Sequence, residues 1–559
     1  MIIVYVNISY PHFLTFVSFK ISIMSLKKKW LAATVLFLIL IFGFLLWPLG
    51  SSKFENEPFA NLLKSKHEYL SSGSQKPSSN RPNILLITVD DLGMADCSLY
   101  GEGDIKTPNI DKLGAEGVVF ENAYVTSPVC APSRASMITG RYQHRFGFEF
   151  TMHERYLSNQ MEYLGFRYLI DSDPWVPKWT DESPSQKAID EQGLPVSEIT
   201  LAEALKKAGY HTGIVGKWHL GWGREKLPSE FGFEEQYGFF NSHSLYVPES
   251  TDGYVDQKID ADWTDSFIWS TQRNGPHAIY RNNVEIEENE YLTDRITKET
   301  IKFIESKREK PFFLWTSYNA PHTPLQAPEK YVEQFKHIKD PVKRVYRAMI
   351  ASLDDNLGEL MEYLRESGLD ENTLIFFISD NGGAEYTFTT DNGRYEGGKN
   401  TEFEGGVKVP MILRWKGVIG EGIRFEPMVS SMDIFTTALT AADAKLPARP
   451  LDGRNLVPFI NDTKMGMPHE YLFWQRGNSK AVRSNEWKLL INDYSGDTLL
   501  YNLANNRFEN PNLARQNPAI VLQLSKAISA WQQNHVEPLW PSVIYFTAIK
   551  DGKEYYFEQ

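Results

Sequence analysis

The sequence predicts an α/β protein in which a large, mixed but mostly parallel sheet is sandwiched between helices. From residue 81 onward, short apolar runs of strand length alternate with amphipathic helical segments. This alternation is typical of a parallel sheet covered on both faces. In open α/β sheets ligands bind beyond the carboxyl ends of the strands. The residues that follow each predicted strand are therefore the first candidates for a functional site.

The first 52 residues are expected to direct the chain out of the cytoplasm. Three lysines at 27–29 precede an uncharged apolar run over residues 30–49, which is the layout of an export signal. A run of about 20 residues is also long enough to span a bilayer as an uncleaved anchor. Both alternatives stay open, and both place the folded part in the periplasm or outside the cell. Residues 53–80 are expected to be a linker.

Four segments are predicted as buried strands, and each leads directly into polar residues. In chain order they are Asn83–Val89 before Asp90-Asp91, His211–Gly216 before Lys217-Trp218-His219, Pro311–Tyr318 before Asn319-Ala320-Pro321-His322, and Thr373–Ser379 before Asp380-Asn381. Taken singly, an Asp-Asp pair after a strand is more often a turn or a helix cap than a ligand. Four such endings at one edge favour a shared site.

Two segments between these strands carry helix signals. Thr200 and Glu203 have capping-box spacing, and Gly209 suits the end of that helix. Residues 342–366 predict a longer helix whose inner side carries Met349, Leu353, Leu357, Leu360 and Leu364.

The strand ends offer oxygen ligands for a metal ion. The donors are three carboxylates and one amide oxygen, from Asp90, Asp91, Asp380 and Asn381. Hard cations prefer such a set, so Ca²⁺ is favoured, Mg²⁺ is second and Zn²⁺ is disfavoured. Without a cation, three converging carboxylates would raise one another's pKa.

The net charge and the two cysteines further restrict the possible functions of the chain. The 58 Lys and Arg residues against 71 Asp and Glu residues give a net charge of −13, which argues against nucleic acid as a partner. An anionic substrate remains compatible, because a local basic pocket can outweigh a screened distant field. A disulfide between Cys97 and Cys130 is the ordinary interpretation for an exported chain. The sequence around Cys130 favours a different role.

Cys130 opens the stretch Cys130-Ala131-Pro132-Ser133-Arg134. Pro132 and Ser133 suit the entry to a short helix, which places residue 130 at a positive helix end with Arg134 one turn on. An ordinary nucleophilic thiolate is one interpretation. The Cys-x-Pro-x-Arg pattern resembles the signature of the type I sulfatases of the alkaline phosphatase superfamily. In that family the cysteine is oxidised to Cα-formylglycine by a maturation enzyme.

The resemblance extends through ordered blocks from about residue 81 to residue 514. The blocks are ITVDDLG (87–93), TPNIDKLGAEG (107–117), CAPSRASMITGRY (130–142), TLAEALKKAGYHTGIVGKWHLG (200–221), APHTP (320–324), SDNGG (379–383), EGGVKVPMILRW (404–415) and YNLANNRFENPNLA (501–514). The last block lacks acidic residues common in the family, which affects the C-terminal part and not the chemistry. The resemblance implies an alkaline phosphatase-like fold and hydrolysis of sulfate monoesters.

The resemblance also implies a covalent mechanism. Residue 130, as formylglycine (3-oxoalanine), would be the nucleophile and a metal ligand beside Ca²⁺. A hydrated aldehyde has one hydroxyl to attack sulfur and a second whose deprotonation re-forms the aldehyde and expels sulfate. Ser242 matches a less strict family serine near the aldehyde. The implied metal ligands are Asp90, Asp91, Cys130, Asp380 and Asn381.

The remaining roles come from the same matches. Arg134 and Lys217 would fix formylglycine and the sulfuryl oxygens. His219 would be the base that drives release of sulfate. His322 and Lys399, with Lys217, would bind sulfate, and the first two would protonate or stabilise the leaving alcohol. Other histidines are expected to be structural, namely His144, His243 and His277.

The expected substrate is a sulfated carbohydrate, with aryl sulfates as the simpler alternative. The segment Thr151–Val196 is longer than the usual family connection and is rich in aromatic residues, which suit either sugar platforms or packing of an insertion. Trp263 and Trp269 share this ambiguity. One competing function is a phosphonate or phosphate ester hydrolase of the same superfamily. Another is a non-catalytic glycan-binding relative with unmodified Cys130.

Two folded parts are expected. A catalytic domain should cover residues 81–440, and a smaller α+β subdomain residues 441–559. In the second part, short strands and a final helix should form an antiparallel sheet with one covered face. These elements are Tyr471–Trp474, Ala481–Arg483, Trp487–Ile491, Thr498–Tyr501 and the helix Pro518–Asn534.

Overall fold

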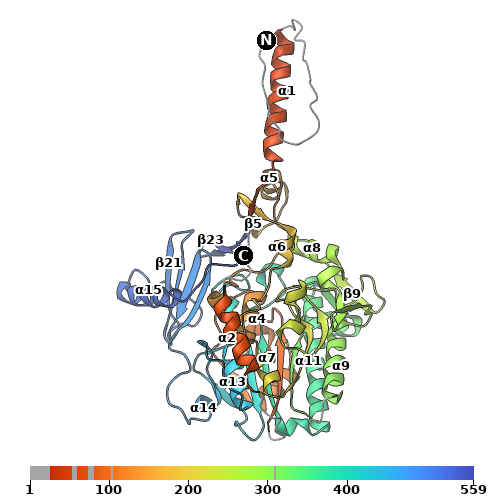
Figure 1. The fold of residues 1–559 in the computed structure, drawn as a ribbon, viewed down its shortest axis with the longest axis vertical. Coiled ribbons are helices and arrows are strands. Elements are labelled where there is room, and N and C mark those ends of the chain that lie inside the picture. Colours follow the sequence, from red (N-terminus) through yellow and green to blue (C-terminus); the bar gives the residue numbers. More distant parts are fainter. Residues whose placement is uncertain (1–25, 53–58, 74–80, 102, 104, 307–309) are drawn as a thin grey trace.

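A ten-stranded mixed sheet forms the centre of the protein in the computed structural model (Figure 1). The structure describes residues 26–52, 59–73, 81–101, 103, 105–306 and 310–559. The strand order is β11-β10-β8-β7-β12-β2-β14-β15-β3-β16, and the five strands from β8 to β14 are parallel. The strands are β2 Asn83–Val89, β3 Val118–Phe120, β7 His211–Lys217, β8 Glu235–Phe239, β10 Ile279–Arg281, β11 Val284–Ile286, β12 Phe312–Ser317, β14 Thr373–Ser379, β15 Met411–Trp415 and β16 Ile423–Phe425. The predicted fold class is confirmed.

Helices cover both faces of this sheet because successive side chains of its strands point to opposite sides. In β2, Ile84 and Leu86 belong to one apolar core, whereas Leu85 and Ile87 belong to the other. The first core includes residues of α4 (Cys130–Thr139), α7 (Leu201–Lys207) and α13 (Asp433–Ala441). The second includes residues of α3 (Pro108–Ala115), α9 (Leu292–Ser306) and α11 (Pro341–Glu366).

The predicted helix starts have the expected capping contacts. The Thr200 side chain accepts a hydrogen bond from the backbone of Glu203, whose carboxylate accepts one from the backbone of Thr200. The longer helix α11 begins at Pro341, one residue before the predicted start, because Asp340 caps the backbone N–H groups of the first turn. Proline fits there since the first turn has no intrahelical partner for its nitrogen.

The C-terminal part contains the predicted four-stranded antiparallel sheet and its covering helix. The elements are β18 Leu472–Arg476, β19 Ser479–Arg483, β20 Trp487–Asn492, β21 Asp497–Asn502 and α15 Pro518–Gln532. Two further strands, β22 (Ile544–Lys550) and β23 (Lys553–Glu558), were not predicted. They form a separate three-stranded sheet with β5 (Trp175–Pro177), so the aromatic-rich insertion is bound to the end of the chain.

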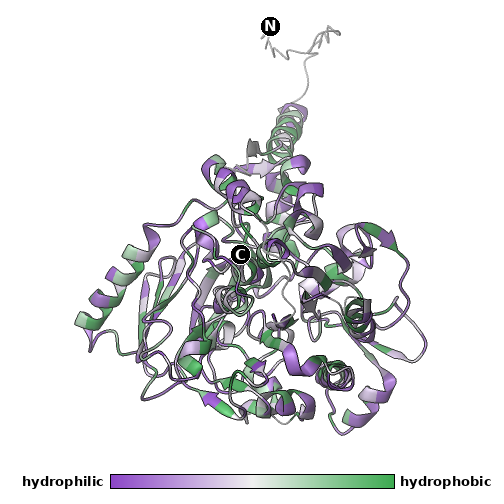
Figure 2. Cartoon of the chain, turned by 60° about the horizontal axis from the view of Figure 1, so that its bottom comes forward, coloured by the Kyte–Doolittle hydropathy of each residue, from purple (hydrophilic) through white to green (hydrophobic). Residues whose placement is uncertain are grey.

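A long apolar helix, α1 (Leu26–Leu45), projects from the body (Figure 1). Figure 2 shows that most of its turns are apolar. Residues 27–45 are long and apolar enough to cross a membrane, by length and composition. An N-terminal signal sequence meets the same criteria, so this helix is consistent with either alternative from the sequence.

The expected linker at 53–80 is only partly correct. Residues Ala60–Ser71 form helix α2, which packs against α7, while residues 53–58 and 74–80 lie outside the described part. Lys66 is buried on α2, where its ammonium lies 2.6 Å from a carboxylate oxygen of Glu203 and donates to two backbone carbonyls. The polar sequence suggested a linker, because a sequence pattern does not reveal that Lys66 pairs with the distant residue Glu203.

The Lys66–Glu203 pair leads to a prediction about stability. Lys66→Met should lower the free energy of unfolding by about 3–5 kcal/mol, because it leaves a buried carboxylate without its cation. Chemical denaturation of both proteins measures this difference. The double variant Lys66→Met/Glu203→Gln should recover part of the loss. The control is Lys187→Met, since the Lys187 side chain is 85% exposed; an equal effect there would contradict the prediction.

Candidate active site

Two neighbouring strands bring the predicted acidic residues to one edge of the sheet. In the β2–β14 pair, Val89 lies opposite Ser379, and Asp380 donates its backbone N–H to the carbonyl of Val89 at 3.0 Å. The residues that follow both strands therefore lie side by side at this edge of the sheet. Asp90, Asp91, Asp380 and Asn381 are all buried, which makes this edge an interior acidic cluster.

Each carboxylate of the cluster is paired with a different buried cation. These cations come from α4, from the end of β7 and from the loop after β14, so three distant segments balance the charge. Charge-assisted contacts of this kind are short and strong. The pairs are Lys217 Nζ with Asp90 Oδ2 at 2.5 Å, Lys399 Nζ with Asp91 Oδ2 at 2.8 Å, and Arg134 Nε with Asp380 Oδ2 at 2.7 Å.

The carboxylates still differ in how easily they ionise. Burial alone would raise the pKa of Asp90, but the ammonium of Lys217 beside it holds that pKa well below its usual range. Burial, and then the charge of Asp90, raise the pKa of Asp380 to about 6. Two close anions therefore repel one another here, and a bound cation would relieve that repulsion.

Cys130 is the first residue of α4 and lies against this cluster. Its Sγ is 3.3 Å from Asp90 Oδ1 and 3.9 Å from Asp91 Oδ1. Burial, followed by Asp380 and Asp90, raises the pKa of the thiol well above its usual value, which does not suit an ordinary thiolate nucleophile. Cys97 and Cys130 are both free, so the disulfide alternative is wrong.

The oxygen donors of Asp90, Asp91 and Asn381 fit a hard cation. Ligand atoms of Asp90, Asp91, Cys130 and His322 all lie within 4.8 Å of one another. The buried Oδ1 of Asn381 accepts no hydrogen bond within the described chain, although Nδ2 of the same amide donates to Asp91 Oδ1 at 2.7 Å. An acceptor without a donor beside carboxylates is what a cation site requires. The sequence did not predict His322 in this group.

Two of the predicted histidines reach the cluster in different ways. His219 follows β7 in a left-handed backbone conformation with φ of 55°, and neither ring nitrogen has a hydrogen-bond partner within the described chain. Burial, then Lys217 and Arg134, lower its pKa well below the usual value, so this imidazole is neutral. His322 donates from Nδ1 to the carbonyl of Thr323 at 2.5 Å, and its Nε2 lies 3.6 Å from Asp91 Oδ2.

A family model described as Sulfatase matches residues 82–444 of this chain. The chain belongs to the sulfatase family. It is therefore a sulfuric ester hydrolase with an alkaline phosphatase-like fold. The model covers the strands that carry the acidic cluster, Cys130 and Lys399.

Individual relatives agree. The sulfatase is 33% identical over 435 residues to the N-acetylgalactosamine-6-sulfatase of Mus musculus, covering 76% of this chain and 74% of that protein. It is 29% identical over 485 residues to the steryl-sulfatase of Homo sapiens, covering 74% and 77%. The structure of Ps i-CgsB in complex with k-i-k-neocarrahexaose has a TM-score of 0.69 at 30% identity, with 82% of this chain and 94% of that chain covered.

A cavity of about 670 Å³ opens onto the acidic cluster of the sulfatase. Cys130, His219, His322 and Lys399 line it together with Ser242, so five of the residues predicted for catalysis or binding share one space. Its other walls come from the insertion, from α8 (Trp263–Thr271) and from β22. The insertion at residues 151–196 and the C-terminal strand β22 therefore border the same cavity.

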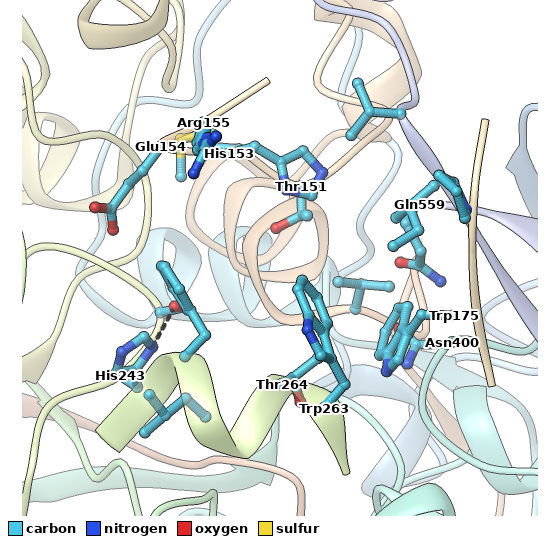
Figure 3. Close-up of a pocket in the computed structure, with 18 of the residues that line it drawn as sticks. Thr151, His153, Glu154, Arg155, Trp175, His243, Trp263, Thr264, Asn400 and Gln559 are labelled. Atoms are coloured by element: carbon cyan, nitrogen blue, oxygen red, sulfur yellow. Dashed lines mark hydrogen bonds between the residues drawn. The ribbon is translucent and has the colours of Figure 1, made fainter. Parts of the chain in front are cut away.

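The walls of this cavity are mainly apolar and include several aromatic rings. Figure 3 shows Trp175 and Trp263 on one side of the view, with Glu154 and His243 on the other. Some aromatic residues of the insertion only pack among themselves, such as Tyr163, whose ring meets that of Trp179 edge to face. Packing within the insertion is therefore observed for Tyr163 and Trp179, while a role of the other aromatic residues as sugar platforms stays a prediction.

One polar group of the cavity was not predicted. Glu154 Oε1 accepts from Nε2 of His277 at 2.5 Å and from the amide of Asn241. His277 stacks on His243 with ring centroids 4.0 Å apart, and His243 shares a 2.9 Å hydrogen bond with Ser242 Oγ. His277, expected to be structural, thus positions the carboxylate of Glu154, whereas His243, also expected to be structural, lines the cavity. No local sequence pattern marks Glu154.

Proposed function

We propose that this sulfatase removes sulfate from a sulfated carbohydrate with a formylglycine residue made from Cys130. One observation supports this most strongly. The cavity has Cys130, His322 and Lys399 in its lining together with indole rings and Glu154. A sulfate ester therefore finds cations beside the reactive residue, while the rest of the substrate meets flat apolar faces and a hydrogen-bond acceptor.

Residue 130 and the acidic cluster would supply the central chemistry. The hydrated aldehyde provides the nucleophile, and Ca²⁺, with Mg²⁺ as the second choice, provides positive charge against the sulfate oxygens. The residues that would hold the cation are Asp90, Asp91, residue 130, Asp380 and Asn381. The free amide oxygen of Asn381 supports this assignment.

The buried cations would bind and orient the sulfuryl group. Lys217 and Arg134 are fixed by Asp90 and Asp380, so their charge is in place before substrate arrives, and such preorganised donors stabilise a developing anion. Lys399 would donate to the leaving oxygen: burial alone would lower the pKa of its ammonium, but Asp91 raises it well above its usual value, which keeps the proton on nitrogen.

His219 and His322 are both neutral. His219 would accept a proton of the formylglycine hydrate, and His322 would contact the leaving alcohol. His219 has unpaired ring nitrogens and would take the proton whose loss allows sulfate to leave. Burial, and then Lys399, lower the pKa of His322 to about 4. Its Nδ1 donates to a carbonyl, so Nε2 presents a lone pair at the site and can accept a hydrogen bond near the leaving alcohol.

Several observations support a carbohydrate as the leaving group. One similar solved structure is of a protein in complex with k-i-k-neocarrahexaose, and the mouse relative is named as an N-acetylgalactosamine-6-sulfatase. Indole faces suit the C–H side of a sugar ring, and a carboxylate accepts hydrogen bonds from hydroxyl groups. Desulfation of a panel of sulfated oligosaccharides tests this, with aryl sulfate and aryl phosphate as comparisons. Turnover of aryl sulfate alone would overturn the proposed substrate class. A preference for aryl phosphate would overturn the proposed reaction.

Glu154 provides a specific prediction for substrate recognition. Glu154→Ala should lower kcat/KM on the preferred oligosaccharide by about 10- to 150-fold, because a hydrogen bond to a charged group contributes about 1.5–3 kcal/mol. Turnover of a small aryl sulfate should change little. The control is Glu162→Gln on the same cavity, where Arg155 and the backbone of Ser158 already engage the carboxylate. Equal losses on both substrates would contradict a role in recognition.

Metal binding should be visible without an activity assay. At a Ca²⁺ concentration 100 times Kd, the folded protein gains about 2.7 kcal/mol, so calcium should raise Tm and a chelator should reverse the change. Asn381→Ala should reduce this calcium-dependent shift because it removes one oxygen ligand. The exposed residue Asp260 supplies the control Asp260→Asn, which should keep the full shift. A Tm independent of calcium in the wild-type protein would contradict the metal assignment.

A further inference from the structure

The chain that leaves α1 enters the folded body at once. Pro48 forms a β-bridge with Asn159, and the N–H of Leu49 donates to the carbonyl of Ser158 at 3.0 Å. Residues Gly50–Ser52 then form β1, which pairs in parallel with β6 (Glu182–Pro184). The segment directly after the helix is therefore part of the body, and a cleavage after Ser52 would remove a paired strand.

These contacts place helix α5 (Gln160–Leu169) at the exit of α1. Asn159 caps α5 and bridges Pro48, three residues after the end of α1. Three residues span at most about 10 Å. If α1 crosses a bilayer, the start of α5 lies within about that distance of its end.

The end of α5 carries exposed apolar side chains at Tyr168, Leu169 and Ile170, which we call the patch, and the exposed Trp179 packs on Tyr163 of the same helix. The Leu169 side chain is 85% exposed, and Trp47 at the end of α1 is exposed as well. Exposed apolar clusters mark interaction surfaces, and Trp and Tyr are enriched at the interface between lipid and water. Arg167, whose guanidinium lies 5.9 Å from the ring centre of Tyr168, adds a cation suited to lipid headgroups.

The same side of α5 belongs to the cavity. Glu162, Gly165 and Phe166 line it, and Leu169 follows Phe166 by three residues and Gly165 by four, which places it on that side of the helix. Ile170 contributes to both the cavity and the patch. The patch therefore lies at the rim of the active-site cavity.

We propose that α1 is a retained membrane anchor and that the patch on α5 docks into the lipid interface of the same bilayer. The occupant of the patch is lipid, because the Pro48–Asn159 bridge holds the start of α5 near the end of the anchor and Arg167 adds a cation beside the patch. Docking would fix the body against the membrane and hold one wall of the cavity at the bilayer surface. The inference rests on the anchor contacts and the patch, and is independent of the substrate.

Fluorescence quenching in the intact chain tests the proposal. The full-length protein carries Leu169→Cys, labelled with an environment-sensitive fluorophore, in nanodiscs of phosphatidylcholine with nitroxide-labelled lipid. Cys97 and Cys130 are buried, and because Cys130 lines the cavity, the protein without the added cysteine is treated with the same fluorophore to measure background labelling. The control is Met465→Cys, which is 96% exposed and follows α14 (Val457–Ile460), at the end of the body away from α1 (Figure 1).

Docking predicts that the label at 169 shifts to shorter wavelength and loses most of its emission to the nitroxide, while the label at 465 does neither. Equal quenching at both positions would overturn docking. A blue shift at 169 without quenching by lipid would also overturn it, because the patch would then be covered by a second copy or another protein. Intact mass of the protein extracted from membranes tests retention of α1. Cleavage between residues 45 and 52 would overturn the anchor.

Discussion

Cys130→Ala should lower sulfatase turnover at least about a thousandfold, because loss of the nucleophile in a covalent enzyme costs up to about 10⁶ in kcat. The cavity provides no second nucleophile at this position, among the described residues that line it. Folding should survive, since alanine fits the first position of a helix and Cys130 makes only weak sulfur contacts. Turnover of an aryl sulfate, with circular dichroism as a check of folding, measures the effect.

The matched control is the other cysteine. Cys97 is buried in the core on one face of the sheet, so Cys97→Ala should lower stability while the enzyme keeps most of its turnover. Mass spectrometry of the tryptic peptide 113–134 from the native host should show the aldehyde in place of the thiol at residue 130. An unmodified thiol in an active preparation would contradict the formylglycine mechanism.

Lys217→Met should lower kcat by about 10²–10³-fold, the loss typical when one preorganised donor to a developing anion is removed. Its ammonium and the Asp90 carboxylate are both fully buried and 2.5 Å apart. The variant leaves that carboxylate without its nearest cation, so stability should fall as well. Single-turnover kinetics would separate the chemical step from substrate binding, and calorimetry would report the change in Tm.

Lys226→Met is the control for this variant. Lys226 is a buried lysine whose ammonium donates to the carbonyl of Leu194 at 3.3 Å, and it does not line the cavity. Its replacement should reduce Tm but leave kcat nearly unchanged. Equal losses of kcat in the two variants would show that Lys217 acts only through stability.

The sequence predicted the parts of this protein that local patterns determine. Apolar runs such as Asn83–Val89 are strands because both faces of the central sheet are covered, and polar residues follow them because the strand ends meet at one edge. His322 follows a predicted strand, whereas only the resemblance placed Lys399 at the site. The structure brings both to the acidic cluster, although their chemical roles stay predictions.

The parts that were not predicted depend on contacts between distant segments. Helix α2 looked like a linker because its Lys66 is polar, and only the fold supplies Glu203 as a partner. Strand β5 pairs with β22, more than 360 residues later in the chain by the register Phe546 to Trp175. His277 and Asn241 position Glu154 by hydrogen bonds. Patterns in a single sequence cannot show that these distant residues are in contact.

The burial of α4 sets the order of events in the life of the protein. Every residue of this helix is buried, and the Cys130 residue is only 2% exposed. A small molecule can reach it through the cavity, but an enzyme that modifies residue 130 would need access to the backbone around it. Under the proposed formylglycine mechanism, conversion of Cys130 would therefore have to precede folding. A molecule that closed its sheet before conversion would then stay inactive, which would make the timing of biogenesis a determinant of how much active enzyme a cell obtains.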